Sequence, residues 1–209
     1  MSAAAGGREG VGRGRVEALS DGVFAIVVTL LVLEIRVPHV EAPVTPAALA
    51  HALQGLLPKF VSWVISFLTV CVIWLNHHRL FAAMARLDGR LFWWNANLLL
   101  WTSFIPFPTA LMGDYPGSPL AVSLYGLVMG LMALGFVLMR RHLLLNPGLL
   151  APEVDLAAFR RTSRAAVLVG PVAYAAGAAV AWLSGPAAFA CYAAIALYFV
   201  FPPKGRPRG

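Results

Sequence analysis

Charged residues are scarce in this chain. Only 12% of its 209 residues are Asp, Glu, Lys or Arg, whereas 60% are hydrophobic and the mean hydropathy is +0.77. A soluble domain normally carries about 25% charged residues because its surface has to be solvated. The shortage of charge therefore excludes an ordinary soluble protein and indicates a membrane protein.

Cysteine is also rare, with Cys71 and Cys191 as the two examples. Each lies within an apolar segment, where a free thiol behaves as a small hydrophobic side chain. We therefore expect two free, buried thiols and no disulfide.

Motifs of enzymes and metal sites are missing as well. The sequence contains no Gly-rich phosphate loop, no G-x-S-x-G and no H-E-x-x-H. The adjacent His77 and His78 would point about 100° apart on a helix, whereas helical metal ligands stand three or four residues apart. We expect no catalytic residue, no structural metal and no cofactor.

Long apolar runs, by contrast, are abundant. About 17–25 helical residues cross the hydrocarbon core of a bilayer. Six runs approach or reach this length, near 16–36, 58–77, 91–112, 118–139, 165–183 and 186–201. The sequence thus predicts an all-α membrane protein with six transmembrane helices.

The basic residues sort to one side of these six segments. Fourteen of the sixteen Lys and Arg residues fall on the side of the N-terminus, and only Arg36 and Lys59 fall on the other. This asymmetry across short loops predicts that both termini are cytoplasmic. Because the positive charge is spread over membrane-flanking loops, its expected partner is anionic lipid headgroups, with no nucleic acid.

One domain is expected between two short ends. We assign residues 1–14 to a disordered cytoplasmic N-terminus, 15–202 to the six-helix domain and 203–209 to a basic cytoplasmic tail. In the outer loop 37–57, Thr45 and Pro46 predict the start of a short helix.

Prolines mark further boundaries. Pro152 is expected to open an amphipathic helix in the cytoplasmic loop 140–164. Pro171 is expected to kink the fifth segment, and Pro106 with Pro108 to bend the third.

The first segment, RVEALSDGVFAIVVTLLVLEI, carries polar groups in a run suited to lipid. At about 100° per residue, Ile26, Leu30 and Leu33 form one narrow stripe, and Ser20 and Asp21 lie over about 100° away. The polar pair is either a helix N-cap near the headgroups or a buried cluster bonded to other helices. The stripe alone is equally compatible with lipid contact or ordinary packing, and the Thr29 hydroxyl can bond back to a carbonyl one turn earlier.

Partners for the polar pair are available at the same depth in the next two segments. A histidine at the cytoplasmic end of the second segment, His77, is the expected partner of Asp21. In the third segment Trp93 and Trp94 suit an interfacial aromatic belt, while Asn95 and the indole N–H groups also supply donors at the level of Ser20.

Three motifs together resemble a known family. They are the R-x-x-x-L-S-D run that starts at Arg15, with Leu19 where the family has Phe, the run WLNHHRLF at 74–81, and the run NLLLWTSFIPFPTALMGDY from Asn97. Over residues 15–115 the chain closely resembles the bacterial branch of the endolysosomal transmembrane (TMEM-type) potassium channel family.

The resemblance implies a potassium-preferring cation channel in a bacterial cell membrane. Its members have six helices per repeat, and the bacterial ones assemble as homotetramers with the first helix lining the pore. The family's constricting positions fall on Ile26, Leu30 and Leu33, and its pore-side threonine on Thr29. The family's structural polar network falls on a set of six residues here: Arg15, Ser20, Asp21, His77, Trp94 and Asn97.

Two further expectations complete this reading. Glu34 either attracts cations to the outer mouth or is a surface carboxylate, and the permeant potassium ion is the only small partner expected. The alternative function is a secondary cation transporter, for example a proton-coupled one, although no inverted repeat is visible. A membrane scaffold without transport is the third reading.

Overall fold

The computed structural model describes residues 12–200, without the side chains of 165–169 and 196–200. Most of the expected disordered N-terminus, the last two positions of the expected six-helix domain (201 and 202) and the whole basic tail lie outside the described residues. Regular structure in the described part is helical throughout, apart from one isolated antiparallel bridge between Met84 and Leu150.

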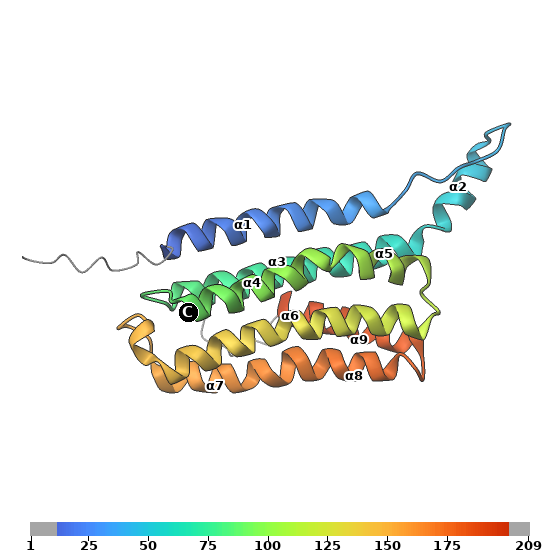
Figure 1. Cartoon of the computed structure of the whole chain (residues 1–209). Coiled ribbons are helices and arrows are strands. Elements are labelled where there is room, and N and C mark those ends of the chain that lie inside the picture. The colour runs from blue at the N-terminus through green and yellow to red at the C-terminus, as the bar shows by residue number, and fades with distance from the viewer. Residues whose placement is uncertain (1–11, 201–209) are drawn as a thin grey trace, which may run out of the picture.

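The helices follow one another with short connections (Figure 1). In chain order they are α1 (Arg13–Leu30), η1 (Leu31–Glu34), α2 (Pro46–Gln54), α3 (Leu57–Ala82), α4 (Gly89–Phe104), α5 (Pro106–Asp114), α6 (Pro119–Leu145), η2 (Pro147–Leu149), α7 (Leu156–Val167), η3 (Leu168–Val172), α8 (Ala173–Val180) and α9 (Gly185–Val200).

Three of the expected spans are single apolar helices long enough to cross a membrane, within Arg13–Glu34, Leu57–Ala82 and Pro119–Leu145. The third expected span is divided into α4 and α5 at Ile105, directly before Pro106. The fifth is divided by the π-helical turn η3, which contains Pro171. Both interruptions were predicted from proline, which removes a backbone donor and crowds the preceding turn.

Capping side chains define several helix starts. The Thr45 hydroxyl accepts a hydrogen bond of 3.1 Å from the N–H of Ala48, and Pro46 occupies the first turn of α2, as predicted. The prediction for Pro152 was wrong, because α7 begins four residues later at Leu156. Asp155 precedes it and accepts from the N–H of Ala157 at 2.8 Å.

The bundle has three tiers in the view of Figure 1. Helix α1 lies along one side, α3, α4 and α5 lie beside it, and α6 to α9 lie on the far side of those. Helix α1 contacts α3 and α4, and α4 packs against α6. The arm that contains α2 extends past the end of the bundle, and α2 has no buried residue.

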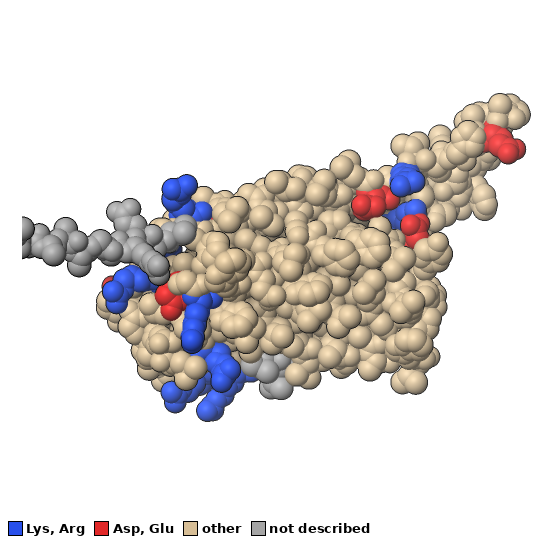
Figure 2. Space-filling model, viewed as in Figure 1, with Lys and Arg blue, Asp and Glu red and all other residues tan. Residues whose placement is uncertain are grey.

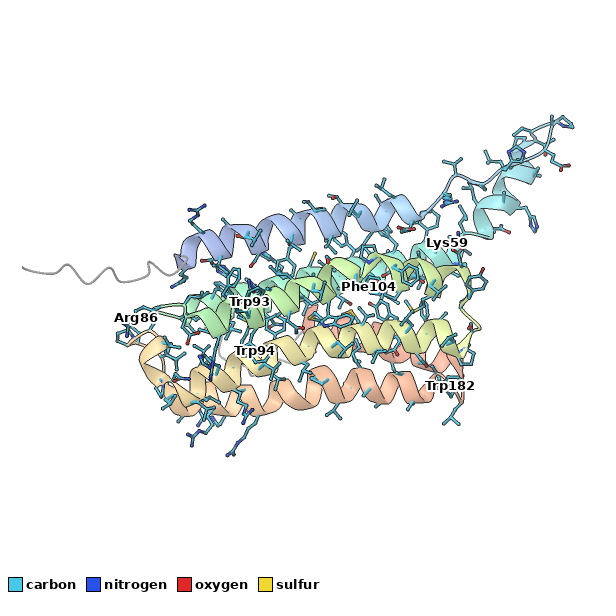
Figure 3. The ribbon with its side chains drawn as sticks, in the orientation of Figure 1. Lys59, Arg86, Trp93, Trp94, Phe104 and Trp182 are labelled. Atoms are coloured by element: carbon cyan, nitrogen blue, oxygen red, sulfur yellow. The ribbon has the colours of Figure 1, made fainter. Side chains whose placement is uncertain are left out.

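Basic and aromatic side chains mark the two ends of the bundle. Figure 2 shows most Lys and Arg side chains on the visible face gathered at one end. In Figure 3, Arg86 lies at that end and Lys59 with Trp182 at the other, while Trp93 and Trp94 lie nearer to Arg86. Trp93 and Trp182 are exposed, as expected of residues in an interfacial aromatic belt.

The two cysteines differ from expectation in one respect. Both are free, but each is exposed on the subunit rather than buried. Cys71 lies on the face of α3 that also carries the exposed Phe67 and Trp74, so a position in an apolar helix did not reveal which face the thiol occupies.

Candidate functional site

Helix α1 has one packed face and one face that no other described residue of the subunit covers. The packed face is made by residues that recur every three or four positions and are nearly inaccessible: Val16, Ser20, Phe24, Val27 and Leu31. On the other side Ile26 is 59% exposed, Leu30 42% and Leu33 69%. The stripe predicted from spacing is therefore the part of α1 that the described part of the subunit, residues 12–200, leaves uncovered.

The end of this stripe is not α-helical. Residues Leu31–Glu34 form the 3₁₀ helix η1. In a 3₁₀ helix residues three apart nearly eclipse one another, which brings Leu33 over Leu30 more directly than a continuous α-helix would. The expectation of one uniform helical stripe thus needed correction at its last position, although all three side chains stay on the unpartnered side.

Two exposed polar side chains, Thr29 and Glu34, lie on or beside this unpartnered side. Thr29 is exposed, and its hydroxyl lies 2.8 Å from the carbonyl oxygen of Ile26 and 3.1 Å from that of Ala25. This is the predicted back-bond, which uses the hydroxyl hydrogen and leaves the oxygen as an acceptor. Glu34 is exposed too, but it lines a small hollow together with Leu31, Lys59 and Trp63, so it borders the packed side of the helix.

A buried polar network holds the packed face of α1 at its basic end. The Ser20 hydroxyl donates to the carbonyl of Val16 at 2.8 Å and accepts from Asn95 Nδ2 at 3.0 Å. Asn95 Oδ1 lies 2.9 Å from His77 Nε2. Because the amide oxygen can only accept, Nε2 carries the hydrogen. The chain of bonds thus joins α1, α4 and α3 through side chains that are at most 1% exposed.

Aromatic rings enclose His77 in this network. The Phe81 ring stacks on the imidazole with 4.2 Å between centroids, and Phe24 meets it edge-on at 5.3 Å. The other ring nitrogen, Nδ1, is buried and has no hydrogen-bond partner among the described residues. His77 thus serves as an N–H donor within the packed interior, whereas the adjacent His78 is exposed.

Asp21 lies outside this network. It is exposed, and its Oδ1 accepts a 2.8 Å hydrogen bond from Trp74 Nε1 of α3. The sequence correctly pointed to bonds from Ser20 and Asp21 to other helices, but the pairing of His77 with Asp21 was wrong. Ser20 and Asp21 are consecutive, and the rotation of about 100° between neighbouring helical residues places Asp21 at the edge of the packed face.

Three other expected members of the network sit elsewhere. Arg15 is exposed, and Trp94 and Asn97 are half-buried. No side-chain hydrogen bond joins these three to Ser20 or His77 in the described part of the chain. Asn95 takes the place assigned to Asn97, because its angular position on α4 turns it toward α1 and α3. The depth of Asn95 in its segment had already marked it as a donor at the level of Ser20, whereas the family resemblance assigned the network to Asn97.

A second buried polar cluster was missed by the sequence reading. Ser66 Oγ lies 2.8 Å from Thr109 Oγ1 and donates to the Tyr125 hydroxyl at 3.3 Å. The cluster joins α3, α5 and α6. Isolated hydroxyl residues in three apolar runs carry no spacing signal, so only the packing brings them together.

Comparison of this sequence with those of known proteins assigns it to a family. Residues 15–106 match the family described as endosomal/lysosomal potassium channel TMEM175. A potassium channel of Streptomyces collinus is 39% identical over 192 residues, which cover 90% of this chain and 91% of the relative. The chain belongs to the TMEM175 family. The predicted resemblance is thus confirmed, and the family is one of ion channels.

Solved TMEM175 structures agree in fold. The crystal structure of a lysosomal potassium-selective channel TMEM175 homolog from Chamaesiphon minutus superposes with a TM-score of 0.78 at 35% identity, covering 90% of this chain and 96% of that one. A second solved TMEM175 potassium channel, at 18% identity and a TM-score of 0.59 over 93% and 96% of the two chains, supports the fold alone. The chain therefore has the TMEM175 channel fold and is a membrane protein.

The animal TMEM175 relatives are larger proteins and are named as proton channels. A human endosomal/lysosomal proton channel TMEM175 is 42% identical over 78 residues, which are 35% of this chain and 16% of the human protein. Members of the TMEM175 family are thus named for potassium and for proton conduction.

Proposed function

We propose that this chain forms a potassium-preferring cation channel in a bacterial cell membrane, as a homotetramer with both termini in the cytoplasm. Each subunit would cross the membrane six times, with α4–α5 and α7–α8 each serving as one broken span. The single observation that carries the proposal is the unpartnered face of α1, because four such faces around an axis would enclose a pore. The names of the bacterial relatives, which are potassium channels, support the choice of ion.

The composition of that face favours a pore over lipid contact. Besides Ile26 and Leu30, the unpartnered side of α1 carries the exposed Thr29, and the exposed carboxylates of Asp21 and Glu34 lie at its borders with the packed face. Carboxylates and hydroxyls within a span normally face protein or water, since acyl chains offer them no hydrogen bonds. An apolar stripe that carries one hydroxyl and is bordered by carboxylates suits an axis shared by water and neighbouring subunits.

The proposed mechanism is passage through an apolar neck. Four copies of Ile26, followed by Leu30 and Leu33, would form a constriction without oxygen atoms to replace the hydration shell of an ion. Such necks conduct when wetted and close by dewetting. Potassium is more easily dehydrated than sodium, so a neck that forces partial dehydration would favour potassium. The acceptor oxygen of Thr29 would meet the ion beside the neck, and Glu34 would concentrate cations at the outer mouth.

The decisive experiment measures ion preference at Ile26. Purified wild type, Ile26→Ala and Ile26→Asn are reconstituted into planar bilayers with potassium on one side and sodium on the other. We expect the reversal potential of both variants to move toward zero, because a wider or polar neck no longer demands dehydration. Leu100→Ala, at an exposed position on α4, is the matched control and should keep the wild-type potential. An unchanged potential in Ile26→Asn would remove Ile26 from the constriction.

The alternative of a secondary transporter, with proton coupling as one form, is tested in the same preparation. Discrete single-channel current steps support the channel. A saturable flux that requires a proton gradient, with no current steps, would replace the channel proposal by the transporter.

A further inference from the structure

Five arginines lie near the end of α6 and on α7, which packs beside it. Two lie on α6 and three on α7: Arg140, Arg141, Arg160, Arg161 and Arg164. The ion pairs within the described residues are formed by Arg13, Lys59, His78 and His142, so none of the five has an acidic partner there. Figure 2 shows basic side chains gathered at this end of the bundle. We call this group the α6–α7 arginine cluster.

Arg140 is held in place by neutral groups. Its Nη1 lies 3.5 Å from both the Thr162 and the Ser163 hydroxyl oxygens, and its guanidinium carbon lies 5.3 Å from the centre of the Phe159 ring. Both hydroxyls donate to the carbonyl of Phe159, at 3.0 and 2.7 Å, so they can only accept from Arg140. A guanidinium has five N–H donors, and these contacts leave most of them for an anion.

The arginines of α7 add charge beside this anchored group. Arg160 and Arg164 stand four residues apart, so they project from one side of α7, next to the face on which Phe159 and Ser163 are buried. Both are exposed, as is Arg141 on α6. The cluster is therefore an open, two-sided cationic surface rather than an enclosed pocket.

Apolar surface adjoins the charge. Leu145, at the end of α6, is 68% exposed, and Leu156, at the start of α7, is 39% exposed. A free nucleotide or phosphate makes no use of such leucines, whereas a lipid lays acyl chains against them. A single guanidinium can bind a phosphate through two parallel N–H bonds, and two arginines on each of the two helices provide enough donors for a headgroup with two phosphates.

We propose that the α6–α7 arginine cluster is a binding site for an anionic phospholipid whose headgroup carries two phosphodiester groups, as in cardiolipin. One phosphate would be bound by Arg140 and Arg141 and the other by Arg160 and Arg164. The site rests on the proposed cytoplasmic placement of this end, where anionic lipids attract basic clusters.

The test uses purified full-length protein in neutral detergent, with lipid binding followed by native mass spectrometry during titration with cardiolipin. Each arginine near an anionic headgroup contributes roughly fivefold to binding, so the double variant Arg160→Gln/Arg164→Gln should bind about 25-fold more weakly. The matched control, Arg15→Gln/Arg79→Gln, removes the same charge from α1 and α3 and should bind as wild type does. Arg160→Lys/Arg164→Lys keeps the charge and should retain most of the binding.

Each contrary result overturns the site. Equal weakening in the control would mean diffuse attraction to positive charge. Equal affinity for phosphatidylglycerol would exclude a headgroup with two phosphates, and complete displacement by pyrophosphate would replace the lipid with a soluble anion. Unchanged melting temperature and helix content show that the glutamine variants are folded. Because the assay measures no current, its failure and a failure of the channel proposal are separate outcomes.

Discussion

Asn95 is the residue on which the junction of three helices depends. It donates to Ser20 of α1 and accepts from His77 of α3, and all three side chains are buried. A buried donor or acceptor left without a partner costs about 1–3 kcal/mol, because it has lost its bonds to water.

Replacement of Asn95 therefore tests the network. Asn95→Ala leaves the His77 N–H without an acceptor, and we expect a loss of about 2 kcal/mol or more, read as a lower melting temperature of the protein in detergent. Asn97→Ala, two residues along the same helix at a half-buried position, should change the melting temperature far less. Equal destabilisation by the two variants would show that the network is not what holds α1.

At the scale of elements, close packing of α4 against α6 depends on a missing side chain. A Cβ at Gly135 would lie 2.9 Å from the Cβ of Leu98 and 3.2 Å from its Cα. Small residues let membrane helices approach in this way, and their interface gains dispersion contacts.

Alanine at two glycines of α6 measures this contact. Gly135→Ala should destabilise the protein by about 1–3 kcal/mol, since α4 must move away or the backbone must shift. At Gly130 the nearest atoms to a new Cβ are 3.9 Å away, so Gly130→Ala should be neutral or stabilising through its higher helix propensity. Thermal unfolding of the two variants in one detergent provides the comparison. If Gly130→Ala were destabilised and Gly135→Ala were not, this account of the α4–α6 contact would be wrong.

A carboxylate also ties α4 to α6. Asp88 Oδ1 accepts from the N–H of Leu91 at 2.8 Å, and Oδ2 accepts from His142 Nε2 at 2.7 Å. Burial by itself would raise the pKa of Asp88, but hydrogen bonds from Leu91 and His142 and the charge of His142 outweigh it and hold the pKa below its ordinary value of 3.8. The bonded, ionised form is thus the one that the fold favours.

The sign of this shift predicts a pH dependence. A carboxyl group whose pKa is lowered by folding contributes stability that is present above the unfolded pKa and is lost as pH falls through the folded pKa. Wild type should therefore exceed Asp88→Asn in melting temperature down to about pH 4 and lose this advantage only below it. The difference should stay below about 1 kcal/mol, because Asp88 is partly exposed. The exposed Glu153→Gln is the control, and a wild-type advantage that disappears already near pH 6 would assign the effect to another group.

At the scale of the whole molecule, charge asymmetry sets the expected orientation. Apart from Arg36 and Lys59, the basic residues of the described part lie near helix ends, in loops or on α7, at one end of the bundle. The positive-inside rule assigns that end to the cytoplasm.

Thiol labelling of intact cells checks this orientation. In a background with Cys71→Ser and Cys191→Ser, a cysteine at Val44, an exposed position of the α2 arm, should react with a membrane-impermeant maleimide from outside. A cysteine at Leu145 should react only after the cells are permeabilised. The reverse labelling pattern would invert the proposed topology and place the arginine cluster outside.

The amino-acid sequence by itself determined the class of this protein and much of its layout. Apolar length, the interrupting prolines and the Thr45 cap depend on local chemistry, which acts the same way in any fold. The stripe of Ile26 and Leu30 was visible for the same reason, since it needs only the rotation of one helix.

The tertiary structure decided which polar groups meet. A helix presents Asn95 and Asn97 about 200° apart, and only the packing of α4 against α1 and α3 selects Asn95 for Ser20 and His77. The same packing leaves Asp21 to Trp74, and turns Cys71 outward. Hydrogen bonds between helices depend on distances and directions to partners far away in the sequence, and no spacing along a single helix contains that information.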